Sequence, residues 1–407
     1  MEMKRIFGLS LCAFCLGTTV WAGDYVLTSP GKTLKVNVNV GNTVSYSVFH
    51  QDKMLMKNNE LSLELENKVL GEHAAVKRVS QNHRKEQIPA FYYRCADFDT
   101  EYNEMKISFK GGYSLIFRAY NEGIAYRWDT DFKDSVLVRN EKAEFNFPEN
   151  YKAYLPYTTN PKGDQYAMAF QNTYTYTSLG EADHKTVAFL PVTVDCGQGL
   201  KVTLLESDLR SYPGMFVRTG EGEYSLNGVF AEYPSEMGVR GPRAMTYVKN
   251  RHDYIAKTEG DRSYPWRIMA ITERDEEMPV NNLVYALAEP SRIKDLSWIQ
   301  GGKVAWDWWN DWGLSGVDFK AGINMDTYKH YIDFAAENHL EFVILDEGWY
   351  HPGKGDMLTV IPELDLPALV AYGRAKGVKL ILWTVFNVLD KPVSYTHLRA
   401  HETGAYL

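Results

Sequence analysis

Apolar and polar residues alternate with a period of two along most of the first 290 positions of the chain. Clear examples occupy residues 34–40, 105–109, 113–118 and 123–128. Successive side chains of a strand point to opposite faces of a sheet, so this period is typical of strands with one buried face. No helical period of convincing length interrupts these runs. The pattern therefore predicts a large antiparallel β-sandwich of two sheets over residues 23–295.

The pattern changes near residue 290. Short apolar runs now alternate with stretches of helical period, in the order strand 303–308, helix 325–339, strand 341–346, helix 362–376 and strand 378–383. A β-α-β-α-β order predicts a parallel sheet with right-handed crossovers. A doubly wound fold would need a Gly-rich turn after its first strand, and residues 309–312 are bulky instead. We therefore expect residues 296–391 to form the first three β/α units of an incomplete (β/α)8 TIM barrel.

The first 22 residues have the features of a signal peptide. Lys4 and Arg5 precede an apolar segment, residues 6–19, which is too short to span a bilayer comfortably. Residues 20–22 (Val-Trp-Ala) supply a cleavage site, and no later apolar run is long enough to cross a membrane. We expect an exported, periplasmic protein without a membrane span.

Composition narrows the classes of function. A formal net charge of −8 without a basic cluster argues against nucleic-acid binding. The aromatic content of 14% has two explanations, a large β-structure or contact with carbohydrate. Cys95 and Cys196 follow the predicted cleavage site, and both a disulfide and two free thiols remain open. Neither cysteine lies in a Cys/His cluster, so zinc binding has no support.

Carboxylates and tryptophans follow the predicted parallel strands. The carboxyl ends of such strands form the active-site face of a barrel. Carboxylates accept hydrogen bonds from hydroxyl groups, and an indole face covers the apolar side of a pyranose ring. The alternatives are aspartates that cap helices and tryptophans that pack in the core. The pattern predicts oligosaccharide binding by Trp306, Asp307, Asp346, Glu347, Trp349, Trp383 and Asn387.

Several motifs resemble glycoside hydrolase family 97, which contains α-galactosidases and α-glucosidases. The matching segments are LTSPG at 27–31, RAYNEGIAYR at 118–127, YPWR at 264–267, SWIQGGKVAWDWW at 297–309 and LDEGW at 345–349. The resemblance implies a super-sandwich, a catalytic barrel and a further β domain. It also implies calcium near the sugar, with one ligand from the N-terminal domain. Asn172 is our candidate for that ligand; the alternative is a turn-forming asparagine.

The resemblance also indicates which catalytic groups to look for. Hydrolysis of a glycoside needs two carboxyl groups. In the family, the retaining nucleophile follows the fourth strand and the acid lies later, so both are expected beyond residue 391. Residues 392–407 have no apolar period, and we interpret them as a non-native tail on a C-terminally truncated chain. We therefore expect this chain to be inactive by itself.

Three functions remain open on the sequence. The preferred one is a retaining α-galactosidase, because residues 383–387 lack the carboxylate that an inverting member would carry there. An inverting α-glucosidase of the same family is the alternative. A non-catalytic carbohydrate-binding protein is the alternative from another class.

Overall fold

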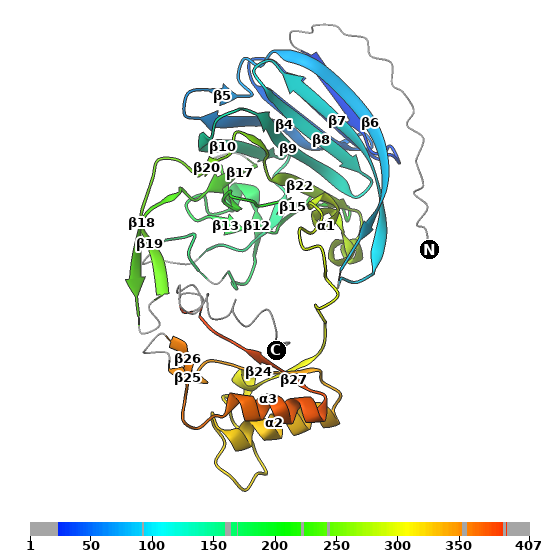
Figure 1. Ribbon diagram of the computed structural model, residues 1–407. Coiled ribbons are helices and arrows are strands. Elements are labelled where there is room, and N and C mark those ends of the chain that lie inside the picture. The colour runs from blue at the N-terminus through cyan, green and yellow to red at the C-terminus, as the bar shows by residue number, and fades with distance from the viewer. Residues whose placement is uncertain are drawn as a thin grey trace, which may run out of the picture. The chain divides into compact units, whose positions relative to one another are not determined.

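The structure is a computed structural model, and its strands and helices form two compact units (Figure 1). It describes residues 23–91, 93–158, 164–168, 170–220, 224–241, 245–351, 356–385 and 388. The N-terminal unit comprises residues up to 235 and residues 251–290, and the C-terminal unit comprises residues 236–250 and those from 291 onwards. The predicted signal peptide, the predicted tail and Asn387 lie outside the described residues.

The N-terminal unit is built from two antiparallel sheets, each of ten strands among the described residues. The first sheet contains, in spatial order, β1 (Gly23–Thr28), β2 (Leu34–Val40), β3 (Val44–His50), β4 (Lys53–Leu65), β10 (Val136–Asn146), β17 (Ser225–Phe230), β16 (Met215–Thr219) and β13 (Ala188–Phe189), with β5 (Val69–Leu70) beside β4 and β20 (Ala256–Thr258) beside β10. The second sheet contains β12 (Thr175–Ser178), β11 (Lys152–Leu155), β14 (Val192–Asp195), β15 (Lys201–Ser207), β22 (Trp266–Thr272), β9 (Gly123–Asp131), β8 (Tyr113–Tyr120), β7 (Asp97–Phe109) and β6 (Val76–Pro89), with β21 (Asp261–Ser263) beside β9. The prediction of a mostly β region is thus confirmed.

A shared apolar core joins the two sheets. Alternate residues of β2 are buried, as the period of two requires. Tyr46 on β3 packs against Phe117 and Tyr126 of the second sheet, with ring centroids 5.7 and 5.5 Å apart. Its hydroxyl lies 3.2 Å from the carbonyl oxygen of Glu144. Burial of apolar side chains such as these is the main favourable term in the folding of this unit.

A buried ion cluster also crosses this core. The side chain of Arg267 on β22 is fully buried and donates to both carboxylate oxygens of Glu141 on β10, at 2.8 and 2.6 Å. It also donates to Glu206 on β15 at 2.7 Å. Burial by itself would lower the pKa of Arg267, but the two carboxylates outweigh it and hold that pKa above its ordinary value. Arg267 therefore stays charged and connects the two sheets.

Three short helices complete the N-terminal unit: η1 (Leu179–Glu181), η2 (Asp275–Val280) and α1 (Leu283–Leu287). The paired strands β18 (Pro234–Arg240) and β19 (Met245–Arg251) lie mostly in residues 236–250, which belong to the C-terminal unit. Leu283 and Leu287 of α1 pack against Ile268 of β22 in a second apolar cluster. Cys95 is exposed and Cys196 is buried, and neither forms a disulfide. Of the two possibilities left open, free thiols are correct.

The C-terminal unit contains a parallel sheet of three strands in its described part, in the order β23-β24-β27. Its elements are β23 (Val304–Trp306), η3 (Asp307–Asn310), α2 (Met325–Glu337), β24 (Phe342–Leu345), β25 (Tyr350–His351), β26 (Asp356–Val360), α3 (Leu366–Lys376) and β27 (Lys379–Leu382). The predicted β-α-β-α-β order is present, and the sequence missed the β25–β26 hairpin. That this sheet begins a TIM barrel stays a prediction.

The two helices of this unit begin at side-chain caps. The Asn324 side chain accepts a hydrogen bond from the backbone N–H of Thr327, and Asp365 accepts one from Ala368, each at 3.0 Å. Gly377 ends α3 with a φ of 75°, which favours glycine. The two helices contact each other beside the sheet (Figure 1).

Within the part of the chain that the structure describes, no helix is long and apolar enough to cross a membrane.

Candidate functional site

The carboxyl ends of the three parallel strands lie at one edge of the sheet. Val304 on β23 pairs with Phe342 on β24, and Phe342 pairs in turn with Lys379 on β27. Asp307, Asp346 and Trp383 are the first residues after these strands, respectively. The structure thus brings together three of the residues that the sequence analysis selected, as expected for parallel strands that end level with one another.

Asp307 lies beneath this edge and contacts neighbouring protein groups. It is fully buried, and its Oδ2 accepts a hydrogen bond of 2.8 Å from the hydroxyl of Tyr328 on α2. The backbone N–H of Asp346 points at the same carboxylate, 3.3 Å from Oδ1 and 3.4 Å from Oδ2. Burial raises the pKa of Asp307. We therefore interpret Asp307 as a residue that positions the chain after β24, although the sequence analysis expected it to contact substrate.

Asp346 is held from two directions. The indole Nε1 of Trp306 donates to its Oδ2 at 2.5 Å, and the backbone N–H of Glu347 donates to its Oδ1 at 2.6 Å. Together these two donors fix the orientation of the Asp346 carboxylate. Gly348 then turns the chain with a φ of 111°, and a Cβ at this position would lie only 2.3 Å from Ile323. This turn ends the strand and leaves the side chain of Glu347 half-buried beside Asp346.

The tryptophans divide into buried and exposed groups. Trp349 is only 2% exposed and donates from Nε1 to the carbonyl oxygen of Trp383 at 2.7 Å. Trp349 therefore packs in the core and joins the chain after β24 to the chain after β27. Trp309 is 75% exposed and contacts Trp306 edge to face, with ring centroids 5.6 Å apart. Because an exposed ring can cover a sugar, Trp309 is a better platform than Trp349.

The sequence analysis missed two residues of this site. It included Tyr328 in the predicted helix 325–339 and Trp309 in the bulky stretch 309–312, and it gave neither residue a role in binding. The helical period did place Tyr328 toward the sheet, but a period cannot show that its hydroxyl reaches a carboxylate.

Tyr328 gives the first prediction. Replacing Tyr328 with Phe should lower the free energy of unfolding of the C-terminal unit by about 1–3 kcal/mol, because the Asp307 carboxylate loses a buried donor. Because the pKa of Asp307 is raised on folding, the native state binds a proton on this carboxyl more tightly than the unfolded state does. The contribution of the Asp307 carboxyl to stability is therefore greatest at pH values below its ordinary pKa. This contribution is lost as the pH rises through the raised pKa of the folded state. The loss of stability in Tyr328→Phe should also increase as the pH rises, because the ionised Asp307 carboxylate is still less favourable without the Tyr328 hydroxyl.

Urea unfolding followed by tryptophan fluorescence, at about pH 5 and about pH 8, measures this effect. Tyr372→Phe is the matched control, since the Tyr372 hydroxyl contacts the half-exposed Asp333 at 2.8 Å. A surface contact of this kind contributes little. Equal losses in the two variants at both pH values would contradict the prediction.

Asn172, the candidate calcium ligand, lies in the N-terminal unit. Its Nδ2 donates to the carbonyl oxygen of Tyr157 at 2.6 Å, which anchors the side chain to the local backbone. Calcium takes six to eight oxygen ligands, several of them usually carboxylates. Among the residues that the structure describes, no group of three or more His, Cys, Asp or Glu side chains could hold a metal ion. That Asn172 contributes a ligand to calcium stays a prediction.

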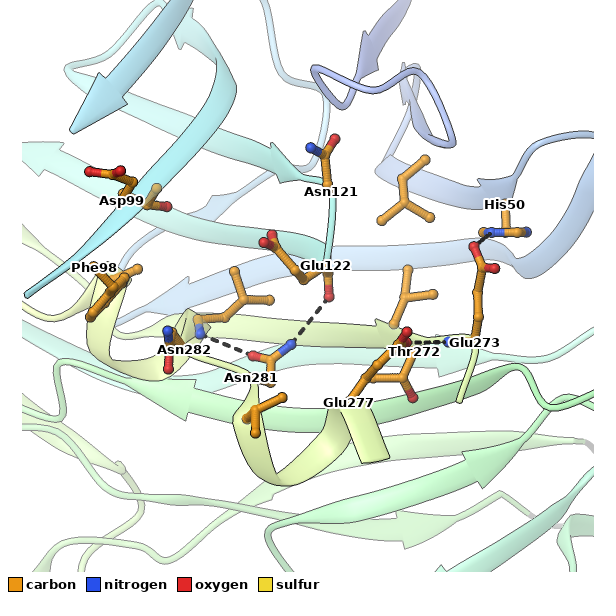
Figure 2. A pocket seen from close by; sticks show the side chains of 16 residues that line it. His50, Phe98, Asp99, Asn121, Glu122, Thr272, Glu273, Glu277, Asn281 and Asn282 are labelled. Carbon is orange, nitrogen blue, oxygen red and sulfur yellow. Dashed lines mark hydrogen bonds and ion pairs between the residues drawn. The ribbon is translucent and has the colours of Figure 1, made fainter. Parts of the chain in front are cut away.

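The N-terminal unit also contains a polar cavity of about 450 Å³, shown in Figure 2. His50 and Glu273 contact each other at 2.9 Å on one side of it. Asn281 donates to the carbonyl oxygen of Glu122 and accepts from the N–H of Leu283. These polar groups mainly hold β3, β22, α1 and the β8–β9 turn together, and we assign them a structural role.

Comparison with known families gives two matches along the chain. Residues 27–290 match the family described as Glycosyl-hydrolase 97 N-terminal, and residues 308–405 match Glycoside hydrolase 97. The second match extends into the segment that the sequence analysis interpreted as a non-native tail.

Two curated proteins are similar in sequence. A retaining alpha-galactosidase of Bacteroides thetaiotaomicron is 39% identical over 395 residues, which are 96% of this chain and 60% of that protein. A probable retaining alpha-galactosidase of Streptomyces bingchenggensis is 26% identical over 75% of this chain and 44% of its own length. The chain thus spans about 60% of the first relative and less than half of the second.

Solved structures show the same fold. A beta-arabinopyranosidase superposes with a TM-score of 0.75 at 19% identity, over 94% of this chain and 60% of its own. A glycoside hydrolase family 97 enzyme from Pseudoalteromonas sp. strain K8, solved with acarbose, superposes with a TM-score of 0.70 at 21% identity, over 88% of this chain and 53% of its own. The match of one family over residues 27–290, more than half of the sequence, shows that the chain belongs to glycoside hydrolase family 97.

Proposed function

We propose that the longer protein to which this sequence corresponds hydrolyses α-galactosides with retention of anomeric configuration. The observation that carries the proposal is the 39% identity to a retaining alpha-galactosidase, which extends over 96% of this chain. The carboxylates that follow β23 and β24 support it, because they lie where a parallel α/β enzyme gathers its active-site groups. The comparisons do not favour the glucosidase or the purely carbohydrate-binding alternative.

The described residues suit sugar binding better than bond cleavage. A retaining glycosidase needs a nucleophile and an acid on opposite sides of the glycosidic bond. Asp346 and Glu347 are adjacent in sequence, and Asp346 already accepts hydrogen bonds from Trp306 and from the Glu347 N–H. We propose that Asp346 and Glu347 accept hydrogen bonds from sugar hydroxyls. Asp307 then positions them through the N–H of Asp346, and Trp309 offers its exposed ring.

Three further proposals concern the whole protein. We propose that the parallel sheet of the C-terminal unit is the start of a TIM barrel, because its strand order and crossover helices are those of βα units. The basic and then apolar character of residues 1–22 supports export to the periplasm. Calcium stays a prediction from the family resemblance, and no step of the proposed reaction depends on it.

Assay of the longer protein tests the proposed reaction. We expect it to release p-nitrophenol faster from p-nitrophenyl α-galactoside than from the α-glucoside, and proton NMR should show α-galactose as the first product. Faster turnover of the glucoside with inversion would replace this proposal with the glucosidase alternative. Absence of hydrolysis of both substrates by a folded protein would reject it.

A further inference from the structure

A second cavity lies on the outer face of the second sheet. Its volume is about 510 Å³, within the range of small-ligand sites. All of its lining residues belong to the N-terminal unit: Tyr154, Tyr174, Pro191, Thr193, Lys201, Thr203, Leu205, Ala270, Thr272, Asp275, Met278, Pro279 and Asn281. None of them belongs to the candidate site after β23 and β24. We call this cavity the tyrosine groove.

The strand register explains why the sheet surface is hollow there. One cross-strand row runs Tyr176–Tyr154–Thr193–Thr203–Ala270 over β12, β11, β14, β15 and β22. Neighbouring side chains of such a row lie on one face of the sheet. Two large tyrosine rings in this row are therefore followed by three small side chains, and these three small side chains form the floor of the groove. Met278 and Pro279 of η2 also line the groove.

The aromatic wall is rigid and accessible. The rings of Tyr154 and Tyr176 stack with centroids 4.3 Å apart and an angle of 26° between their planes. Because Tyr176 covers one face of Tyr154, the other face is the one that is free to line the groove. Tyr154 is 37% exposed and Tyr174 is 44% exposed. The Tyr174 hydroxyl is anchored on the carbonyl oxygen of Pro191 at 3.2 Å.

Polar groups are placed beside this wall. The hydroxyls of Thr193 and Thr203 lie 2.9 Å apart, and the Thr203 hydroxyl also lies 3.9 Å from Sδ of Met278, so the pair keeps mainly its capacity to accept hydrogen bonds. Lys201 and Asp275 form an ion pair of 2.5 Å at one end of the groove. The Lys201 side chain is only 9% exposed, whereas Asp275 is 73% exposed. The two charges cancel, so the groove complements a neutral ligand.

We propose that the tyrosine groove binds a neutral pyranose unit of an oligosaccharide through residues of the N-terminal unit alone. The open face of Tyr154 would cover the C–H side of the ring. The threonine hydroxyls and the Lys201–Asp275 pair would meet the sugar hydroxyls. The choice of α-galactosides as probes rests on the proposed function. The choice of a neutral saccharide rests on the groove itself.

Binding to the 407-residue chain tests the groove without any catalysis. Raffinose and maltotriose are titrated by calorimetry up to about 10 mM, because an isolated sugar subsite binds weakly. Saturable binding of either sugar is expected. Tyr154→Ala should weaken it about tenfold or abolish it, whereas Tyr154→Phe should preserve it, because the phenyl face is retained.

Tyr233→Ala is the matched control. Tyr233 is 46% exposed and stacks on Tyr254 with centroids 5.6 Å apart, but it does not line the groove. Circular dichroism checks that each variant is folded. No binding of either sugar, or binding that Tyr154→Ala leaves intact, would overturn the proposal. Hydrolysis by the longer protein is a separate measurement, so failure of the groove and failure of the proposed reaction are distinguishable.

Discussion

Replacing Arg267 with methionine should lower the free energy of unfolding of the N-terminal unit by about 3–5 kcal/mol. The guanidinium is fully buried and donates to Glu141 and to Glu206. The side chain of Glu141 is 3% exposed and that of Glu206 is 12% exposed. Without Arg267, two carboxylates would remain in the core with no counter-charge. Stranded buried charges of this kind are among the most destabilising consequences of a single substitution.

The raised pKa of Glu206 predicts how the loss of stability in Arg267→Met changes with pH. Burial is the largest cause of that shift and outweighs the opposing effect of Arg267. A carboxyl whose pKa is raised on folding adds least stability when pH is above the folded pKa. Loss of Arg267 should raise the pKa further, so the variant should be least stable, relative to the parent chain, near neutral pH. The deficit should shrink as pH falls toward the ordinary pKa of a glutamate.

Urea unfolding followed by far-ultraviolet circular dichroism measures the stability of this mostly β unit. Adding Glu141→Gln to Arg267→Met should recover part of the loss, because it removes one stranded charge. Arg139→Met is the control, since Arg139 pairs at the surface with Asp253, whose side chain is 78% exposed. If Arg267→Met and the control unfold at the same midpoint urea concentration, the buried ion cluster around Arg267 does not stabilise the fold.

Replacing Asp346 with asparagine in the longer protein should lower kcat/KM for an α-galactoside about 100-fold, or roughly 3 kcal/mol of transition-state stabilisation. The substitution removes the charge that we propose to accept hydrogen bonds from the sugar. It also places an amide NH₂ toward one of two donors, the Trp306 indole and the Glu347 backbone N–H. Both consequences weaken the hold on substrate.

A control separates this effect from loss of folding. Asp365→Asn makes the same chemical change at the N-cap of α3, where asparagine caps a helix as well as aspartate does. It should leave kcat/KM unchanged. Thermal melting of both variants shows whether they are folded. An Asp346→Asn protein that is folded and keeps full kcat/KM would remove Asp346 from the substrate site.

Periodicity by itself predicted much of the fold. The alternation in β2 follows from a strand with one dry face, and the buried Tyr331, Ile332 and Ala335 of α2 follow from a helical stripe. The parallel strand order also predicted that Asp307 and Asp346 would approach each other. These features depend on local geometry and on short connections, which a sequence pattern records.

Only the tertiary structure decided how each side chain is used. The pattern could not distinguish Asp307, which is buried against Tyr328, from a residue that contacts substrate. It could not show that Trp349 packs in the core while Trp309 is exposed. Likewise, the floor of the tyrosine groove combines strands whose neighbours are set by long-range register. Burial and hydrogen-bond partners come from residues that are distant in the chain, and a local pattern contains no information about them.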